Sequence, residues 1–149
     1  MLLQIATGTG LLIANIMVAA LAALVLELVF QRAHPWLIRP PARPKLVVLL
    51  AGVSLWVLAV ITAGVWIWAL AFLWLKAMPD LETAVYFSLV TFTTLGFGDV
   101  LLDHGWRILA GMEAANGFLS FGLLGALMVE TLRQVRLSQI ETRRRKTEK

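Results

Sequence analysis

Residues 80–99 read DLETAVYFSLVTFTTLGFGD, and this stretch decides how the rest of the chain is interpreted. Asp80 is suited to the N-cap of a helix, because its carboxylate can accept hydrogen bonds from the free amides of the first turn. Residues 81–93 are enough for a short helix, which is too short to cross a membrane. Gly96 and Gly98 follow, and glycine adopts backbone conformations that other residues avoid. The stretch therefore predicts a short helix followed by a non-helical strand.

Long apolar stretches flank this segment on both sides. Residues 1–26 and 46–75 carry no charged side chain, and residues 108–129 carry only Glu113. The chain is 60% hydrophobic and 15% charged, and its mean hydropathy is +0.83. Because a membrane-spanning helix needs about 20 apolar residues, we expect an all-α membrane protein with three transmembrane helices. A cleaved signal peptide at residues 1–26 is the less favoured alternative, since the stretch lacks a basic start.

The charges outside these stretches predict an orientation. The linker at 31–45 has basic residues and no acidic ones, and the tail at 133–149 is rich in arginine and lysine. Acidic residues outnumber basic ones in the segment 76–107. By the positive-inside rule, the linker and the tail are cytoplasmic, and the N-terminus and the acidic segment are external. We expect a multi-pass protein of the plasma or inner membrane, with its basic segments on anionic lipids.

The short helix at 81–93 returns to the side that the chain left, so we expect it to be re-entrant. Non-helical backbone at membrane depth persists only where protein buries it or where it lines water. Several copies of residues 94–97 around one axis would stack their oxygens in rings. Such rings replace the water shell of a monovalent cation, and the C-terminal end of the short helix would favour a cation beneath them.

Residues 93–99, TTLGFGD, resemble the signature of the potassium channel pore family, T-T-V-G-Y-G-D. The resemblance extends over 46–132 and implies a pore domain in a cyclic homotetramer that conducts K⁺ passively. Its parts would be an outer helix, a pore helix, a selectivity filter and an inner helix, at 46–75, 81–93, 94–99 and 106–132. The helix at 1–30 is additional to this pattern.

The resemblance also assigns roles to single residues. The K⁺ ligands would be the backbone carbonyls of Thr94, Leu95, Gly96 and Phe97, with the Thr94 hydroxyl. The residues expected to support the filter are Gly98, Asp99, Tyr86, Phe87, Thr91 and Glu113. Gly117 is either a gating hinge or a site of close helix packing. Asn116 and Ser120 either line the cavity or form hydrogen bonds between helices.

Two departures from the family pattern concern the rigidity of the filter. Phe97 replaces the tyrosine whose hydroxyl braces the filter in many members, and Val90 replaces a glutamate found behind the filter in some bacterial members. A hydrogen bond between Tyr86 and Asp99 is our hypothesis for a partial substitute. A weakly selective monovalent cation channel and a non-conducting channel-like membrane subunit are therefore kept as alternatives.

Other classes of function find little support. The chain has no cysteine, so disulfides and thiolate metal sites are excluded. We see no nucleophile–base pair or histidine cluster that would suggest an enzyme, and no module for nucleic acid. The expected partners are further copies of this chain, K⁺ in the filter and anionic lipids, without an organic cofactor.

Overall fold

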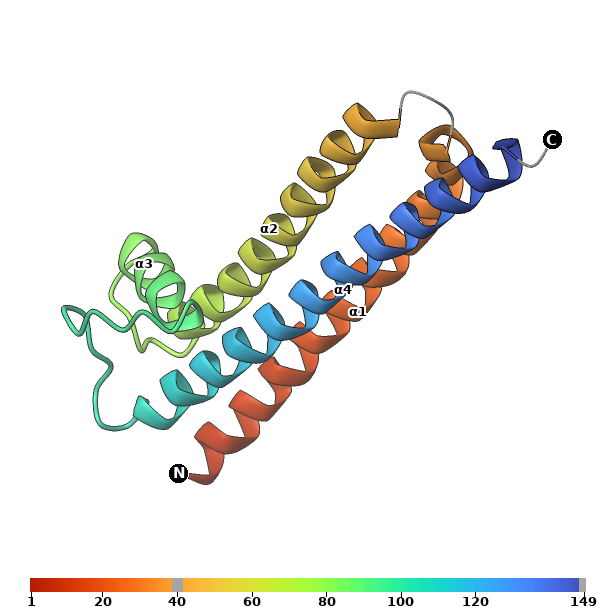
Figure 1. Cartoon of the computed structure of the whole chain (residues 1–149). Helices are drawn as coiled ribbons and strands as arrows, with labels where there is room; N and C mark the ends of the chain where they lie inside the picture. The colour runs from red at the N-terminus through yellow and green to blue at the C-terminus, as the bar shows by residue number, and fades with distance from the viewer. Residues whose placement is uncertain (39–41, 148–149) are drawn as a thin grey trace.

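The computed structural model describes the backbone of residues 1–38 and 42–147 and the side chains of residues 1–33 and 44–140. Within these ranges every regular element is an α-helix, which confirms the predicted all-α fold (Figure 1). The helices are α1 (Leu2–Ile38), α2 (Ala42–Trp74), α3 (Leu81–Phe92) and α4 (Arg107–Thr147). Residues 39–41 of the expected linker and residues 148–149 of the expected tail lie outside the described part.

Three of these helices are long and apolar enough to cross a membrane. Their apolar parts are Leu2–Ala33, Pro44–Trp74 and Arg107–Ile140. The chain is a multi-pass membrane protein with the three predicted spans. Helix α1 continues to Ile38, into the segment expected to be linker, and α4 continues through the basic residues to Thr147. The arginine-rich end of α4 consists largely of residues with good helix propensity, which explains its length. Helix propensity does not explain the longer α1, because Pro35 lies within it.

The helices bring the two predicted sides of the chain to opposite ends of the molecule. Helices α1 and α4 pack against each other and run in the same direction, and α2 runs the opposite way (Figure 1). The N-terminus lies at the end that holds α3 and the loops around it. The end of α1, the start of α2 and the C-terminus lie at the other end.

The hydrophobic core lies at the α3 end of the molecule. Trp68 and Phe72 of α2 are fully buried there, with Phe92 of α3 and Leu109 of α4. The ring of Phe72 meets the ring of Phe87 edge to face, with 5.4 Å between their centroids, a favourable geometry for aromatic pairs. This core fixes α3 between α2 and α4.

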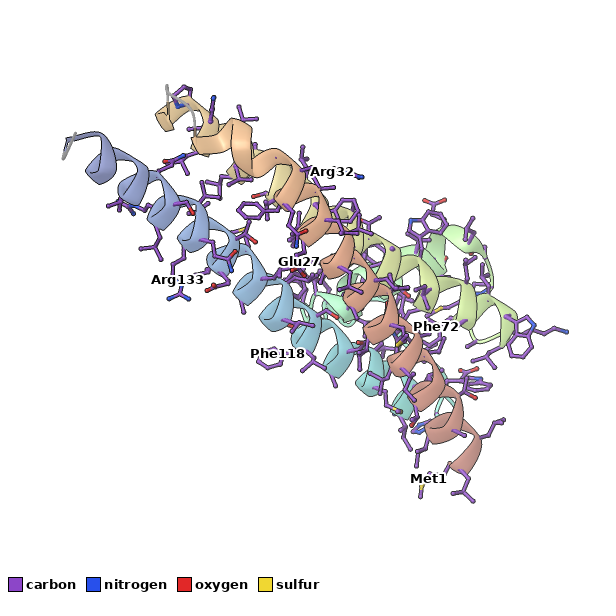
Figure 2. All side chains as sticks on the ribbon, turned by 90° about the vertical axis from the view of Figure 1, so that its right-hand side faces the viewer. Met1, Glu27, Arg32, Phe72, Phe118 and Arg133 are labelled. Atoms are coloured by element: carbon purple, nitrogen blue, oxygen red, sulfur yellow. The ribbon has the colours of Figure 1, made fainter. Side chains whose placement is uncertain are left out.

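Large apolar side chains elsewhere point outward. Phe118 of α4, for example, projects from the helix bundle and is 76% exposed (Figure 2). Exposed apolar side chains are normal where a surface faces acyl chains or further copies of the chain. The helices themselves approach each other through small residues. A Cβ on Gly8 of α1 would overlap Sδ of Met112 and lie 3.0 Å from Cδ1 of Leu109, both on α4.

Candidate functional site

Helix α3 begins at the predicted cap. The two carboxylate oxygens of Asp80 accept hydrogen bonds from the backbone amide of Thr83 at 2.9 Å and from its hydroxyl at 2.8 Å. The bond from the amide is the largest cause that lowers the pKa of Asp80 below its ordinary value. The carboxylate also carries a charge that favours a helix N-terminus. Asp80 thus fixes where α3 starts. The C-terminal end of α3 leads into the glycine-containing strand.

The chain leaves α3 through a tight set of hydrogen bonds. The amide of Thr94 donates to the carbonyl of Thr91 at 2.9 Å, and the amide of Leu95 donates to the carbonyl of Val90 at 3.0 Å. The Thr93 hydroxyl donates to the carbonyl of Leu89 at 2.7 Å. Carbonyls at a helix end need such partners, because the helix no longer supplies them. The start of the strand is therefore held in register with α3.

The strand after α3 has an alternating backbone. The φ angles of Thr94, Gly96 and Gly98 are +61°, +58° and +79°, whereas neither Leu95 nor Phe97 has a positive φ. The amides of Leu95 and Gly96 both donate to the carbonyl of Val90, at 3.0 and 3.3 Å, so these two amides face α3. Two of the three left-handed positions are glycines, which adopt this conformation without strain. Every residue from 94 to 99 is exposed in the single chain.

A side-chain hydrogen bond ties the far end of the strand back to α3. The hydroxyl of Tyr86 donates to Oδ2 of Asp99 at 2.5 Å, which is the bond hypothesised from the sequence. This hydrogen bond is the main cause that lowers the pKa of Asp99, because it stabilises the ionised carboxylate. The same bond raises the pKa of Tyr86. The strand is thereby fixed to the pore-helix candidate at both of its ends.

A hollow of about 400 Å³ lies behind the strand. Six of the predicted site residues line it, together with residues of the loop 100–102 and the start of α4. These six are Tyr86, Phe87, Thr91, Gly96, Gly98 and Asp99. The structure thus brings most of the predicted supporting residues together around one side of the strand.

Glu113 lies apart from this hollow, on the buried side of α3. It is fully buried, it adjoins Ser88 of α3, and its carboxylate has no hydrogen-bond partner among the described residues. An ionisable group at such a place is a candidate for function. Its position next to Ser88 of α3 and outside the hollow favours a role in supporting α3 over direct contact with an ion.

Two buried polar residues near α3 or within it were not predicted from the sequence. They are Asn15 of α1 and Ser88 of α3. Asn15 lies next to Gly64 of α2, because a Cβ on Gly64 would be 3.1 Å from Oδ1 of Asn15 and 2.9 Å from Cζ of Phe92. The available signal was a lone asparagine in an otherwise uncharged apolar stretch, since polar residues in membrane helices usually face other helices. The additional helix α1 therefore contributes to the surroundings of α3.

Gly117 lies where α4 crosses the end of α3. A Cβ at this position would overlap the carbonyl oxygen of Phe92 and lie 3.0 Å from its Cα. Of the two roles left open by the sequence, this contact favours close packing, because small residues let backbones approach.

The two residues predicted for the cavity differ in burial. Asn116 has no exposed surface within the single chain, and neither its Nδ2 nor its Oδ1 has a hydrogen-bond partner among the described residues. In one chain it therefore neither lines an open cavity nor forms the expected hydrogen bond between helices. Ser120, one turn further along α4, is half-buried and keeps an open side.

Comparison with known proteins agrees with this arrangement. The family model described as "Ion channel" matches residues 55–134, which include most of α2, all of α3 and the strand, and the larger part of α4. A human protein, potassium channel subfamily K member 18, is 37% identical over 65 residues. The match covers 39% of this chain and 16% of that relative. No solved structure matches. Because the family model covers more than half of the chain and is centred on the re-entrant helix and its strand, the chain belongs to the ion channel family, with a pore domain of the potassium channel type.

Proposed function

We propose that this chain forms a potassium-selective channel, as a homotetramer in which residues 94–97 of four copies line one path. The observation that carries the proposal is the alternating backbone of the strand, with positive φ at Thr94, Gly96 and Gly98. A backbone that alternates in this way allows a row of carbonyls to face one side, and the strand is exposed in the single chain. Further copies around a common axis would close that open side.

The physical role of the carbonyls is to replace water. An ion that enters a narrow path loses its hydration shell, and rings of carbonyl oxygens from Thr94, Leu95, Gly96 and Phe97 offset that loss. Several such rings in series allow ions to push one another onward, so binding does not stop conduction. The partly negative C-terminal end of α3 favours a cation at the inner end of the strand.

The proposed outer mouth is acidic. Asp80 and Asp99 lie at the two ends of the α3–strand unit, and Glu82 and Asp103 lie in the same exposed segment. Carboxylates at the mouth of a path raise the local concentration of cations. This fits the proposed orientation, in which the N-terminus and this segment are external and the basic end is cytoplasmic.

The test is ion flux into liposomes that contain the purified chain. With a K⁺ gradient and a protonophore present, we expect K⁺ flux that exceeds Na⁺ flux by a large factor. Gly96→Ala should abolish most of this flux, because alanine at a φ of +58° is strained and would reorient the carbonyls. Gly105→Ala is the matched control, since Gly105 has open space around its Cβ position and no positive φ.

Two outcomes would contradict potassium selectivity. Equal fluxes of Na⁺ and K⁺ would indicate a weakly selective cation channel, the reading that the missing hydroxyl at Phe97 favours. Absence of flux from an intact tetramer would indicate a non-conducting channel-like subunit.

A further inference from the structure

A groove separates α1 and α2 at the end of the molecule opposite to α3. Its volume is about 290 Å³, and its lining is almost entirely apolar. The lining includes Val25, Val29 and Ala33 of α1 and Val48, Gly52 and Trp56 of α2. All of these lie within the apolar spans of the two helices, so the groove lies at the depth of the acyl chains.

The groove is closed toward the middle of the membrane. The indole Nε1 of Trp56 donates a hydrogen bond to the backbone carbonyl of Ala22 at 3.2 Å, which ties the two helices together at that level. Beyond this bond the groove is open, because a Cβ on Gly52 would meet no heavy atom within 4 Å. The groove is therefore a slot that is blocked at its deep end and extends toward the end of the span.

Two basic residues lie at the shallow end of this slot. Arg32 is exposed near the end of the apolar span of α1, next to the lining residue Ala33 (Figure 2). Lys45 lies on α2 about one turn before Val48, so that helical spacing puts it on the same face as the lining. The sequence from 31 to 45 contains no acidic residue. The slot thus combines an apolar interior with a positively charged entrance.

We propose that this groove binds one acyl chain of an anionic phospholipid, whose phosphate lies between Arg32 and Lys45. The apolar slot matches the chemistry of an acyl chain, and the basic entrance matches a negative headgroup at the membrane surface. An amphipathic ligand with these two parts satisfies both features at once. The site involves α1, which lies outside the matched pore domain, and it does not depend on conduction.

Lipid binding to the purified full chain tests the proposal. Phosphatidylglycerol and phosphatidylcholine with the same acyl chains are compared by native mass spectrometry, and phosphatidylglycerol with brominated acyl chains is used to quench the fluorescence of Trp56. We expect phosphatidylglycerol to bind about tenfold or more tightly, given two basic residues at the surface. The quenched signal should be lost in Trp56→Phe.

Two variants separate the parts of the site. Gly52→Leu should fill the groove and remove the bound lipid, whereas Gly10→Leu on α1, which also has open space at its Cβ, should not. Arg32→Gln with Lys45→Gln should remove the preference for the anionic headgroup, and Lys76→Gln at the opposite end should leave it unchanged. Circular dichroism shows whether each variant keeps its helices, and Gly52→Ala gives a milder change if Gly52→Leu does not fold.

Several results would overturn the proposal. Equal binding of the two phospholipids, or full binding by Gly52→Leu in its helical state, contradicts a specific lipid site. Absence of bound lipid, together with an association between chains that Gly52→Leu abolishes, would assign the groove to an interface between copies of the chain. Because the readout is lipid binding, a failure here leaves the proposed conduction untouched, and loss of flux leaves this site untouched.

Discussion

The bond between Tyr86 and Asp99 joins the middle of α3 to the far end of the strand. Its first consequence is a pH dependence. The hydroxyl of Tyr86 lowers the pKa of Asp99, so the ionised carboxylate and its contribution to the folded site are present above the ordinary pKa of aspartate. That contribution is lost as the external pH falls through the lowered pKa in the folded state.

Tyr86→Phe should therefore move this acid-induced loss to a higher pH, since the Asp99 pKa would return toward its ordinary value. K⁺ flux into liposomes, measured against external pH for both proteins, checks the direction of the shift. Asp99→Asn should remove the transition and serves as the control. An unchanged midpoint in Tyr86→Phe would show that the hydroxyl does not act on Asp99 in the assembled protein.

Gly117 gives a second prediction at a single position. Gly117→Ala forces a methyl group into the carbonyl of Phe92, and overpacking of this kind costs about 1–3 kcal/mol. The variant should lower the melting temperature of the protein in detergent. Gly122→Ala and Gly125→Ala, which have open space on the same helix, should not. A pure hinge role predicts the reverse, an unchanged melting temperature with altered gating in single-channel recordings.

At the scale of elements, local signals in the sequence predicted α3 well. The cap at Asp80 was expected from its side chain, and the helix ends at Phe92, one position from the expected end. The strand was expected from its two glycines, and both have positive φ. Such features depend on neighbours in sequence, and so a single sequence contains most of the information needed.

Contacts between helices could not be predicted in the same way. The burial of Asn15 and the close approach of Gly64 to Phe92 depend on how α1, α2 and α3 cross, which no local pattern fixes. The hydrophobic pattern of these helices does not show which face packs against a neighbouring helix, because nearly all of their side chains are apolar. The polar residues Gln4 and Asn15 of α1 were signals for an inward face, and both are buried. Their neighbours on the other helices became clear only once the packing was known.

The packing of α1 on α4 yields a prediction for an element. Gly8→Leu places a large side chain against Met112 and Leu109, so it should separate the two helices and destabilise the fold by about 1–3 kcal/mol. Thermal unfolding of the purified chain measures the effect. Gly10→Leu, two positions away in open space, should unfold like the unmodified protein. Equal unfolding of all three would show that α1 does not pack on α4 through Gly8.

At the scale of the whole molecule, a single chain leaves its central feature incomplete. The strand at 94–99 is exposed throughout, and Phe97 is 67% exposed. The proposal that four copies assemble to cover this surface comes from the resemblance to a family. Neither the residue pattern nor the structure of one chain determines the number of subunits. A test of the fourfold assembly must therefore measure the assembled protein and not the single chain.

Ion binding provides such a test. Carbonyl rings at residues 94–97 exist only when several copies meet, so K⁺ in the filter would bind the assembly and not its separated subunits. A ligand at about 100 times its dissociation constant stabilises the state that binds it by about 2.7 kcal/mol. We expect the heated protein to keep a tetrameric mass to a higher temperature in K⁺ than in Na⁺ at equal ionic strength, as measured by gel or light scattering. Gly96→Ala should remove this difference while Gly105→Ala keeps it. Equal stability of the unmodified protein in both salts, or a stable assembly of any other number of copies, would contradict the proposed filter.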